Sequence, residues 1–210
     1  MGELIVLTEQ LADRARPQAQ ARPSFFFDLA CPFSYLAAER VERLLGAVEW
    51  VPVAGPLRAH PVEGSLRPAA EARAKELRLP LVWPESFPAP ARSALRAAVC
   101  ATQVGVGARF ALAAARLAFC GGFELEDPEV LAEAAAASSF GLEECLAAAG
   151  NEALDGSLHA TARGLLARGV GRLPAVRVGH GFFAGEELLS QAAAVRRAAA
   201  GYESWAFPLG

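Results

Sequence analysis

Cysteine is sparse and unpaired in this sequence. The four cysteines, at positions 31, 100, 120 and 145, form neither the closely spaced pairs of a metal site nor the dense set of a disulfide-bonded secreted domain. The three histidines, at positions 60, 159 and 180, share no ligand spacing either. We therefore expect no metal site, and a reducing compartment, with the cytoplasm as the default location.

Long uncharged apolar runs and basic clusters are also missing. The most apolar stretch, residues 94–120, is interrupted by three arginines, and the first seven residues lack the pattern of a secretion signal. The 20 Lys and Arg residues are balanced by 23 Asp and Glu residues and form no run typical of a phosphate-binding surface. We expect a soluble protein without a membrane or nucleic-acid partner.

An α/β pattern opens the foldable part of the chain. Residues 24–29 (SFFFDL) predict a buried strand, residues 35–45 carry apolar positions at helical spacing, and residues 48–53 predict a second strand. A strand, a helix and a strand this close together form a right-handed parallel unit.

The pattern returns to strands near the end of the chain. Residues 175–178 and 182–184 predict a hairpin around the turn at 179–181, and residues 186–200 predict a closing helix. Between the two α/β parts, residues 68–168 are Ala-rich and show only helical patterns, with helices expected to start after Asp127 and near Leu142.

This order predicts one domain rather than two. We expect a loosely held leader over residues 1–23 and a single domain over 24–200, whose outer parts (about 24–60 and 169–200) enclose a helical insertion (about 61–168). Residues 201–210 form an aromatic tail that packs on the core or on a partner subunit. A homodimer is therefore a hypothesis.

Cys31 is the candidate reactive residue. It follows the first strand and precedes Pro32, a residue favoured in the first turn of a helix. Free N–H groups and the helix dipole favour a thiolate at that end. The alternative is a buried packing cysteine. Ser34 lies where a dithiol enzyme has its second cysteine, so it either donates a hydrogen bond to a sulfur anion or acts as a capping residue.

The segment 27–37 (FDLACPFSYLA) resembles the active-site segment of the DsbA-like branch of the thioredoxin superfamily. It is most similar to that of 2-hydroxychromene-2-carboxylate isomerases and kappa-class glutathione transferases, and the similarity continues through residues 92–98, 118–131 and 169–189. The resemblance implies an α/β thioredoxin-like fold with a large all-helical insertion. It also implies that Pro32 and Phe33 line the site.

The resemblance also implies a binding edge opposite the cysteine. Pro174 matches the family's cis-proline, which leaves the backbone of Leu173 free to pair with a peptide or with glutathione. Arg172 replaces the family's usual residue before this pair, which favours an anionic substrate. Gly185 and Glu187 match the stretch where an acidic side chain meets the glutamyl amine of glutathione, and Glu186 is a near-equal alternative.

Three functions follow from this resemblance. The first is a thiol oxidoreductase that uses Cys31 alone, with glutathione as cosubstrate and a small molecule as substrate. The second is a glutathione-dependent isomerase or transferase. The third, from another class, is a non-catalytic domain that senses oxidants through Cys31 or binds a peptide along the cis-proline edge.

Overall fold

The computed structural model describes residues 22–55, 57 and 66–206, with side chains up to residue 199. The predicted leader lies outside this part of the chain except for Arg22 and Pro23. Pro23 is buried and its carbonyl accepts a hydrogen bond from Glu49 N at 2.8 Å. Pro23, the last residue of the predicted leader, is therefore already joined to the second strand by a backbone hydrogen bond.

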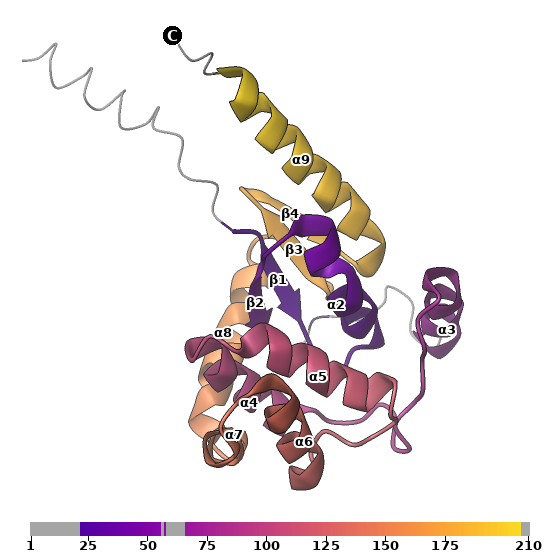
Figure 1. Ribbon diagram of the computed structural model, residues 1–210, viewed down its shortest axis with the longest axis vertical. Helices are drawn as coiled ribbons and strands as arrows, with labels where there is room; N and C mark the ends of the chain where they lie inside the picture. The colour runs from indigo at the N-terminus through magenta and orange to yellow at the C-terminus, as the bar shows by residue number, and fades with distance from the viewer. Residues whose placement is uncertain (1–21, 56, 58–65, 207–210) are drawn as a thin grey trace, which may run out of the picture.

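A four-stranded mixed sheet forms the centre of the domain. Its strands are β1 (Ser24–Phe27), β2 (Glu49–Pro52), β3 (Ala175–Val178) and β4 (Gly181–Ala184), in the order β2-β1-β3-β4. β1 and β2 run parallel, whereas β3 lies antiparallel to both β1 and β4. The predicted parallel unit and the predicted hairpin are therefore confirmed, and they join into one sheet (Figure 1).

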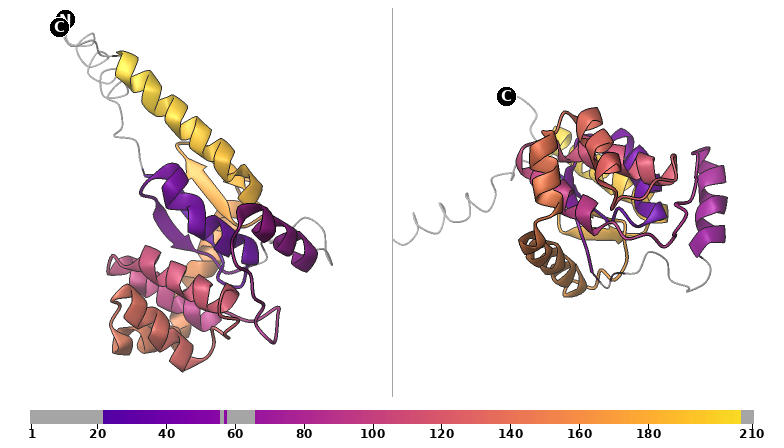
Figure 2. Two further views of the ribbon diagram at one scale, coloured as in Figure 1. Left: turned by 45° about the vertical axis from the view of Figure 1, so that its right-hand side comes forward. Right: turned by 90° about the horizontal axis from the view of Figure 1, so that it is seen from below.

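Two helices complete the thioredoxin-like part of the domain. α2 (Pro32–Leu45) connects β1 to β2, and α9 (Leu189–Ala206) follows the short 3-10 turn η2 (Glu186–Leu188). α9 projects well beyond the sheet (Figure 2). The closing helix was predicted to stop at residue 200, and that end was wrong. Gly201 costs only about 1 kcal/mol inside a helix, which the helix-forming residues on both sides offset.

The insertion is helical throughout its described part. It contains α3 (Leu66–Leu77), α4 (Arg92–Gln103), α5 (Gly107–Phe119), α6 (Pro128–Ser138), α7 (Leu142–Ala149), the 3-10 turn η1 (Glu152–Leu154) and α8 (Asp155–Leu166). Asp127 caps α6 by accepting a hydrogen bond from Glu129 N at 2.9 Å, as predicted. α4 to α7 form a bundle below the sheet, while α3 stands to one side (Figure 1).

The two faces of the sheet bury different helices. Side chains alternate along a strand, so Phe25 and Phe27 join the main core with α2 and the helical bundle, whereas Phe26 joins a smaller core with Ala162 and Leu165 of α8. The main core runs without interruption from the sheet into the bundle. The insertion therefore shares one hydrophobic core with the sheet. Within the described residues, no helix is long and apolar enough to cross a bilayer.

Candidate active site

The register of the sheet brings three predicted segments to one edge. Phe26 pairs with Ala175, and Ala175 pairs with Ala184. The loop before α2 follows the end of β1, Pro174 precedes the start of β3, and Gly185 follows the end of β4. All three segments therefore lie at the same edge of the sheet. Gly185 N donates to Pro174 O at 2.7 Å. The Leu173–Pro174 peptide bond is cis.

Cys31 is the N-cap residue of α2, with Pro32 in the first helical turn. Its backbone is extended, and its carbonyl accepts hydrogen bonds from Ser34 N at 3.0 Å and Tyr35 N at 3.2 Å. The thiol-bearing residue is only 4% exposed, and Pro32, Phe33 and Ser34 are buried beside it. The sequence thus places the thiol correctly at a helix N-terminus, but the fold also buries it.

Burial reverses the expected ionisation of Cys31. Removal from water raises the pKa of its thiol to about 11, and the charge of Asp28 adds to that rise. Hydrogen bonds from the Ser34 side chain and from the Ser34 and Phe33 backbone lower the pKa by less. The prediction of a favoured thiolate was therefore wrong for the unliganded protein, because desolvation outweighs the hydrogen-bond donors of the helix terminus.

Asp28 and Ser34 frame the thiol. Asp28 N donates to Ser34 Oγ at 3.2 Å, and Ala30 N donates to Asp28 Oδ1 at 2.9 Å. Burial raises the pKa of Asp28 to about 6, although the Ala30 amide and the charge of Arg92 both oppose that rise. Ser34 does not cap α2. Its hydroxyl accepts from Asp28 N in the preceding loop, and it opposes the larger effect of burial on the pKa of Cys31, which favours the first of the two roles considered for it.

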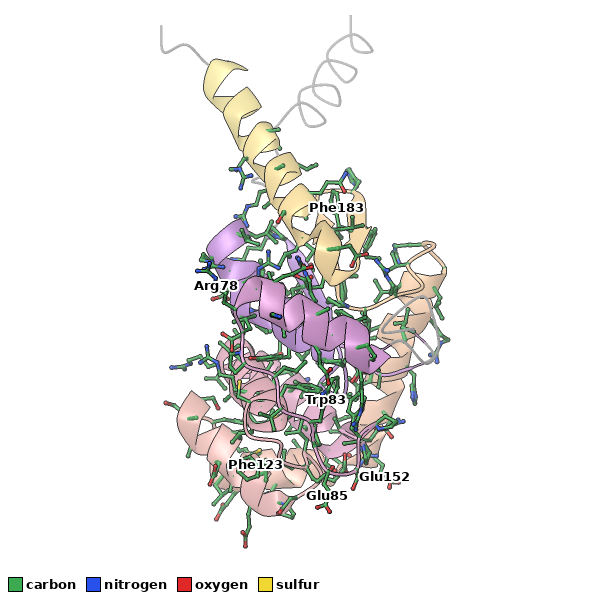
Figure 3. All side chains as sticks on the ribbon, turned by 90° about the vertical axis from the view of Figure 1, so that its right-hand side faces the viewer. Arg78, Trp83, Glu85, Phe123, Glu152 and Phe183 are labelled. Atoms are coloured by element: carbon green, nitrogen blue, oxygen red, sulfur yellow. The ribbon has the colours of Figure 1, made fainter. Side chains whose placement is uncertain are left out.

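A shallow apolar cleft adjoins the Cys31 loop. Leu29 and Ala30 form one wall, and Phe87, Phe119 and Phe123 belong to the other walls. Figure 3 shows Phe123 on the helical lobe and Trp83 below α3. The helical insertion therefore supplies most of the residues that line this cleft.

Glu186, one of the two predicted amine ligands, is occupied by the protein itself. Its side chain is 1% exposed and accepts from Arg73 Nε at 2.5 Å and from Arg40 Nη1. Arg40 lies on α2 and Arg73 on α3, so one carboxylate joins three elements. The assignment of Glu186 to glutathione is corrected on this ground. The sequence around η2 could not reveal that Glu186 is buried in an ion pair, because both arginines come from elsewhere in the chain.

Glu187, in contrast to Glu186, is accessible to solvent. Its side chain is 55% exposed and pairs with Arg172, which also donates from Nη2 to Ala184 O at 2.7 Å. Arg172 was predicted to reach toward the site for an anionic substrate. In the structure its guanidinium donates hydrogen bonds to Ala184 O, at the end of β4, and to the Glu187 carboxylate, and it lies next to Gly185.

Gly185 adopts a conformation that other residues avoid. Its φ is +114°, and a Cβ atom placed on it would lie 1.9 Å from Arg172 Nη2. We expect Gly185→Ala to lower the free energy of unfolding by about 1–2 kcal/mol, because of backbone strain and loss of the Arg172 contacts. Urea denaturation checks this value. Gly171→Ala is the matched control, since a Cβ atom there meets nothing within 4 Å; equal losses in both variants would contradict the explanation.

The other three cysteines lie in the insertion, and all four are free thiols. Cys145 is fully buried, and burial raises its pKa to about 11. Cys100 and Cys120 are partly exposed, and Cys120 Sγ lies 3.1 Å from Tyr35 Oη. No group of His, Cys, Asp and Glu suited to a metal ion occurs among the described residues.

Sequence reasoning missed Asp28, Arg40, Arg73 and Arg92. Only Asp28 had a usable local signal, since aspartate is favoured at the first position of a turn and lies three residues before Cys31. The arginines contact the site only through the packing of α2, α3 and α4.

Comparison with known proteins identifies the same architecture. Residues 24–194 match the model of the DSBA-like thioredoxin domain. A 2-hydroxychromene-2-carboxylate isomerase superposes with a TM-score of 0.67 and 14% identity over 89% of this chain and 99% of its own. A probable DsbA oxidoreductase from Streptomyces coelicolor gives 0.65 and 21% over 90% and 92%.

A third similar structure was solved with GSH. It is the cytosolic disulfide reductase DsbM from Pseudomonas aeruginosa, with a TM-score of 0.63 and 18% identity over 87% of this chain and 98% of its own. No curated protein sequence matches the chain. The family match and the shared fold confirm the resemblance predicted from residues 27–37.

Proposed function

Since the chain belongs to the DSBA-like thioredoxin domain family, we propose that it is an enzyme whose Cys31 thiol exchanges with glutathione or another small disulfide. One observation carries this proposal. Cys31 occupies the N-cap of α2 at the sheet edge that also holds Pro174 and Gly185. Ser34, which cannot form a disulfide, stands where a second thiol would lie.

The reaction has two exchange steps. The sulfur of Cys31 attacks one sulfur of a disulfide, a new S–S bond forms, and the other half leaves as a thiol after taking up a proton. A second external thiol then attacks the mixed disulfide and releases Cys31. Cys100, Cys120 and Cys145 lie in the helical insertion, so we assign the resolving step to a thiol from solution. A reducing compartment such as the cytoplasm supplies glutathione for it.

Glu187 is the acidic residue that we assign to the amine of glutathione. It is exposed at the edge of the site, whereas Glu186 is already paired with two guanidinium groups. Arg172 next to it offers a cation for a carboxylate of the same ligand. The GSH-containing structure of a protein with the same fold supports glutathione as the cosubstrate.

Intact and peptide-level mass spectrometry after incubation with oxidised glutathione tests the proposal. We expect a glutathione adduct on Cys31 that reduced glutathione removes, and no such adduct in Cys31→Ser. Cys100→Ser and Cys120→Ser serve as controls, because these thiols are partly exposed and can form adducts of their own. An adduct that disappears only in the control variants would show that Cys31 is not the exchanging thiol.

The ionisation of Cys31 favours a second candidate function. A thiol with a pKa near 11 stays protonated at neutral pH, so it is able to donate a hydrogen bond to the sulfur of bound glutathione. In a glutathione-dependent isomerase the glutathione sulfur, rather than Cys31, would add to the substrate. Binding of reduced glutathione without any exchange at Cys31 would favour this reaction over the first.

A further inference from the structure

Asp28 and Cys31 are the two ends of one tight turn. Cys31 N donates to Asp28 O at 3.1 Å, and the Asp28 side chain closes the same turn by accepting from Ala30 N at 2.9 Å. The Cα atoms of the end residues of such a turn lie within about 7 Å of each other. The carboxyl group and the thiol therefore share one loop, and neither depends on a distant segment to meet the other.

The hydrogen bonds leave one oxygen of Asp28 available. Oδ1 accepts from Ala30 N, while Oδ2 accepts no hydrogen bond within the described part of the chain. Ser34 lies beside both groups, since its hydroxyl accepts from Asp28 N at 3.2 Å and opposes the larger effect of burial on the pKa of Cys31. A proton leaving the thiol thus has a nearby acceptor.

The helical insertion supplies the charge that opposes Asp28. Arg96 binds both oxygens of Asp155, at 2.7 and 2.8 Å, whereas Arg92 Nη1 lies 3.5 Å from one of them. His159 Nε2, 3.2 Å from Arg92 Nη1, acts as an acceptor there because a guanidinium offers only donors. Asp155 is thus mainly neutralised by Arg96. The positive charge of Arg92 remains effective at Asp28, where it lowers the pKa of the carboxyl group.

We propose that Asp28 accepts the proton of the Cys31 thiol during exchange and that the positive charge of Arg92, from α4, favours the ionised form of the Asp28 carboxyl group. This inference rests on the proposed function. In the step, the S–H bond breaks, its proton moves to Asp28, and the sulfur electron pair forms the new S–S bond while the disulfide bond of the substrate breaks. The departing thiolate takes up that proton from Asp28, directly or through water.

The ionisation of the two groups explains why the site needs such an acceptor. With a pKa of about 11, Cys31 carries a thiolate in only about one molecule in 10,000 at pH 7. Asp28, with a pKa of about 6, is mostly ionised at the same pH. Among the described residues, Cys31 at the N-cap of α2 and Arg92 on α4 are the titratable and charged groups that interact electrostatically with Asp28.

The rate of Cys31 alkylation by iodoacetamide, followed from pH 5 to 9 by peptide mass spectrometry, tests the inference. This neutral probe forms an S–C bond, releases iodide, and leaves the thiol proton to a base. For the wild-type protein we expect a rise with an inflection near pH 6, where Asp28 ionises. Asp28→Asn keeps the carbonyl that caps Ala30 N, so we expect a rate about 10- to 100-fold lower at pH 7 and no inflection near pH 6.

The competing explanation gives the opposite sign. If Asp28 were only a negative neighbour, its removal would lower the pKa of Cys31 and accelerate alkylation at pH 7. An equal or faster rate in Asp28→Asn therefore overturns the proposal, as does a wild-type profile without the inflection. Cys100 and Cys120 in the same digests are internal controls whose rates should not change.

Arg92→Gln provides a second readout if Asp28→Asn fails to fold. We expect the inflection of Cys31 alkylation to move to higher pH, because loss of the positive charge raises the pKa of Asp28. An unchanged inflection removes Arg92 from the proposal. Alkylation does not involve glutathione, so a missing glutathione adduct would count against the proposed function alone.

Discussion

Replacing Glu186 by glutamine is expected to lower the free energy of unfolding by about 3–5 kcal/mol, the usual cost of removing one partner from a buried ion pair. The Glu186 carboxylate is 1% exposed, and Arg40 beside it is 11% exposed. Without the carboxylate, Arg40 and Arg73 would lose the anion that they share. Arg73 would keep its ion pair with the exposed Glu76. Desolvation already lowers the pKa of Arg40 in the intact protein.

Urea denaturation of Glu186→Gln and Glu187→Gln measures this effect with a matched control. The two residues are adjacent and each pairs with arginine, but the side chain of Glu187 is 55% exposed. An exposed ion pair contributes about 0–1 kcal/mol, so Glu187→Gln should change stability little. If both variants lose the same free energy, burial of Glu186 is not what makes its ion pair important.

Asp28→Asn is expected to make the protein more stable at pH 7, by about 1–3 kcal/mol, since each unit of pKa shift corresponds to about 1.4 kcal/mol. The folded pKa of Asp28 is about 6, against an ordinary value of 3.8. Its folded state therefore binds a proton more tightly than its unfolded state does. The stability that this proton gives is complete below pH 3.8 and is lost as the pH rises through 6. Asparagine carries no charge to bury.

Denaturation of the wild-type protein and of Asp28→Asn between pH 3.5 and 7.5 checks this sign. The difference between the two should be small at the acid end, should grow between about pH 4 and 6, and should then stay constant. A variant that is less stable than the wild type at pH 7 would show that the carboxylate contributes to folding. That outcome would conflict with the rise in the pKa of Asp28 that its burial causes.

Together these results would separate structure from chemistry at the site. Glu186 holds α2, α3 and η2 together, so its removal should weaken the fold. Asp28 destabilises the fold while it serves the reaction, a combination that is common at functional sites. The same Asp28→Asn variant should then be more stable and react more slowly.

The sequence by itself determined the secondary structure and the place of the thiol. The aromatic apolar run in residues 24–29, the helical spacing of 35–45 and the Asp127–Pro128 start of α6 are local patterns, and backbone hydrogen bonding acts over the same short range. Pro32 after Cys31 fixed the start of α2 for the same reason. The resemblance of residues 27–37 then identified the family.

Only the tertiary structure decided the electrostatics of the site. Whether Cys31 ionises depends on its burial, and whether Glu186 or Glu187 is accessible depends on Arg40 and Arg73, which lie more than 100 residues earlier in the chain. Ionisation and accessibility are set by all the atoms around a group, and those atoms come together only when distant segments pack.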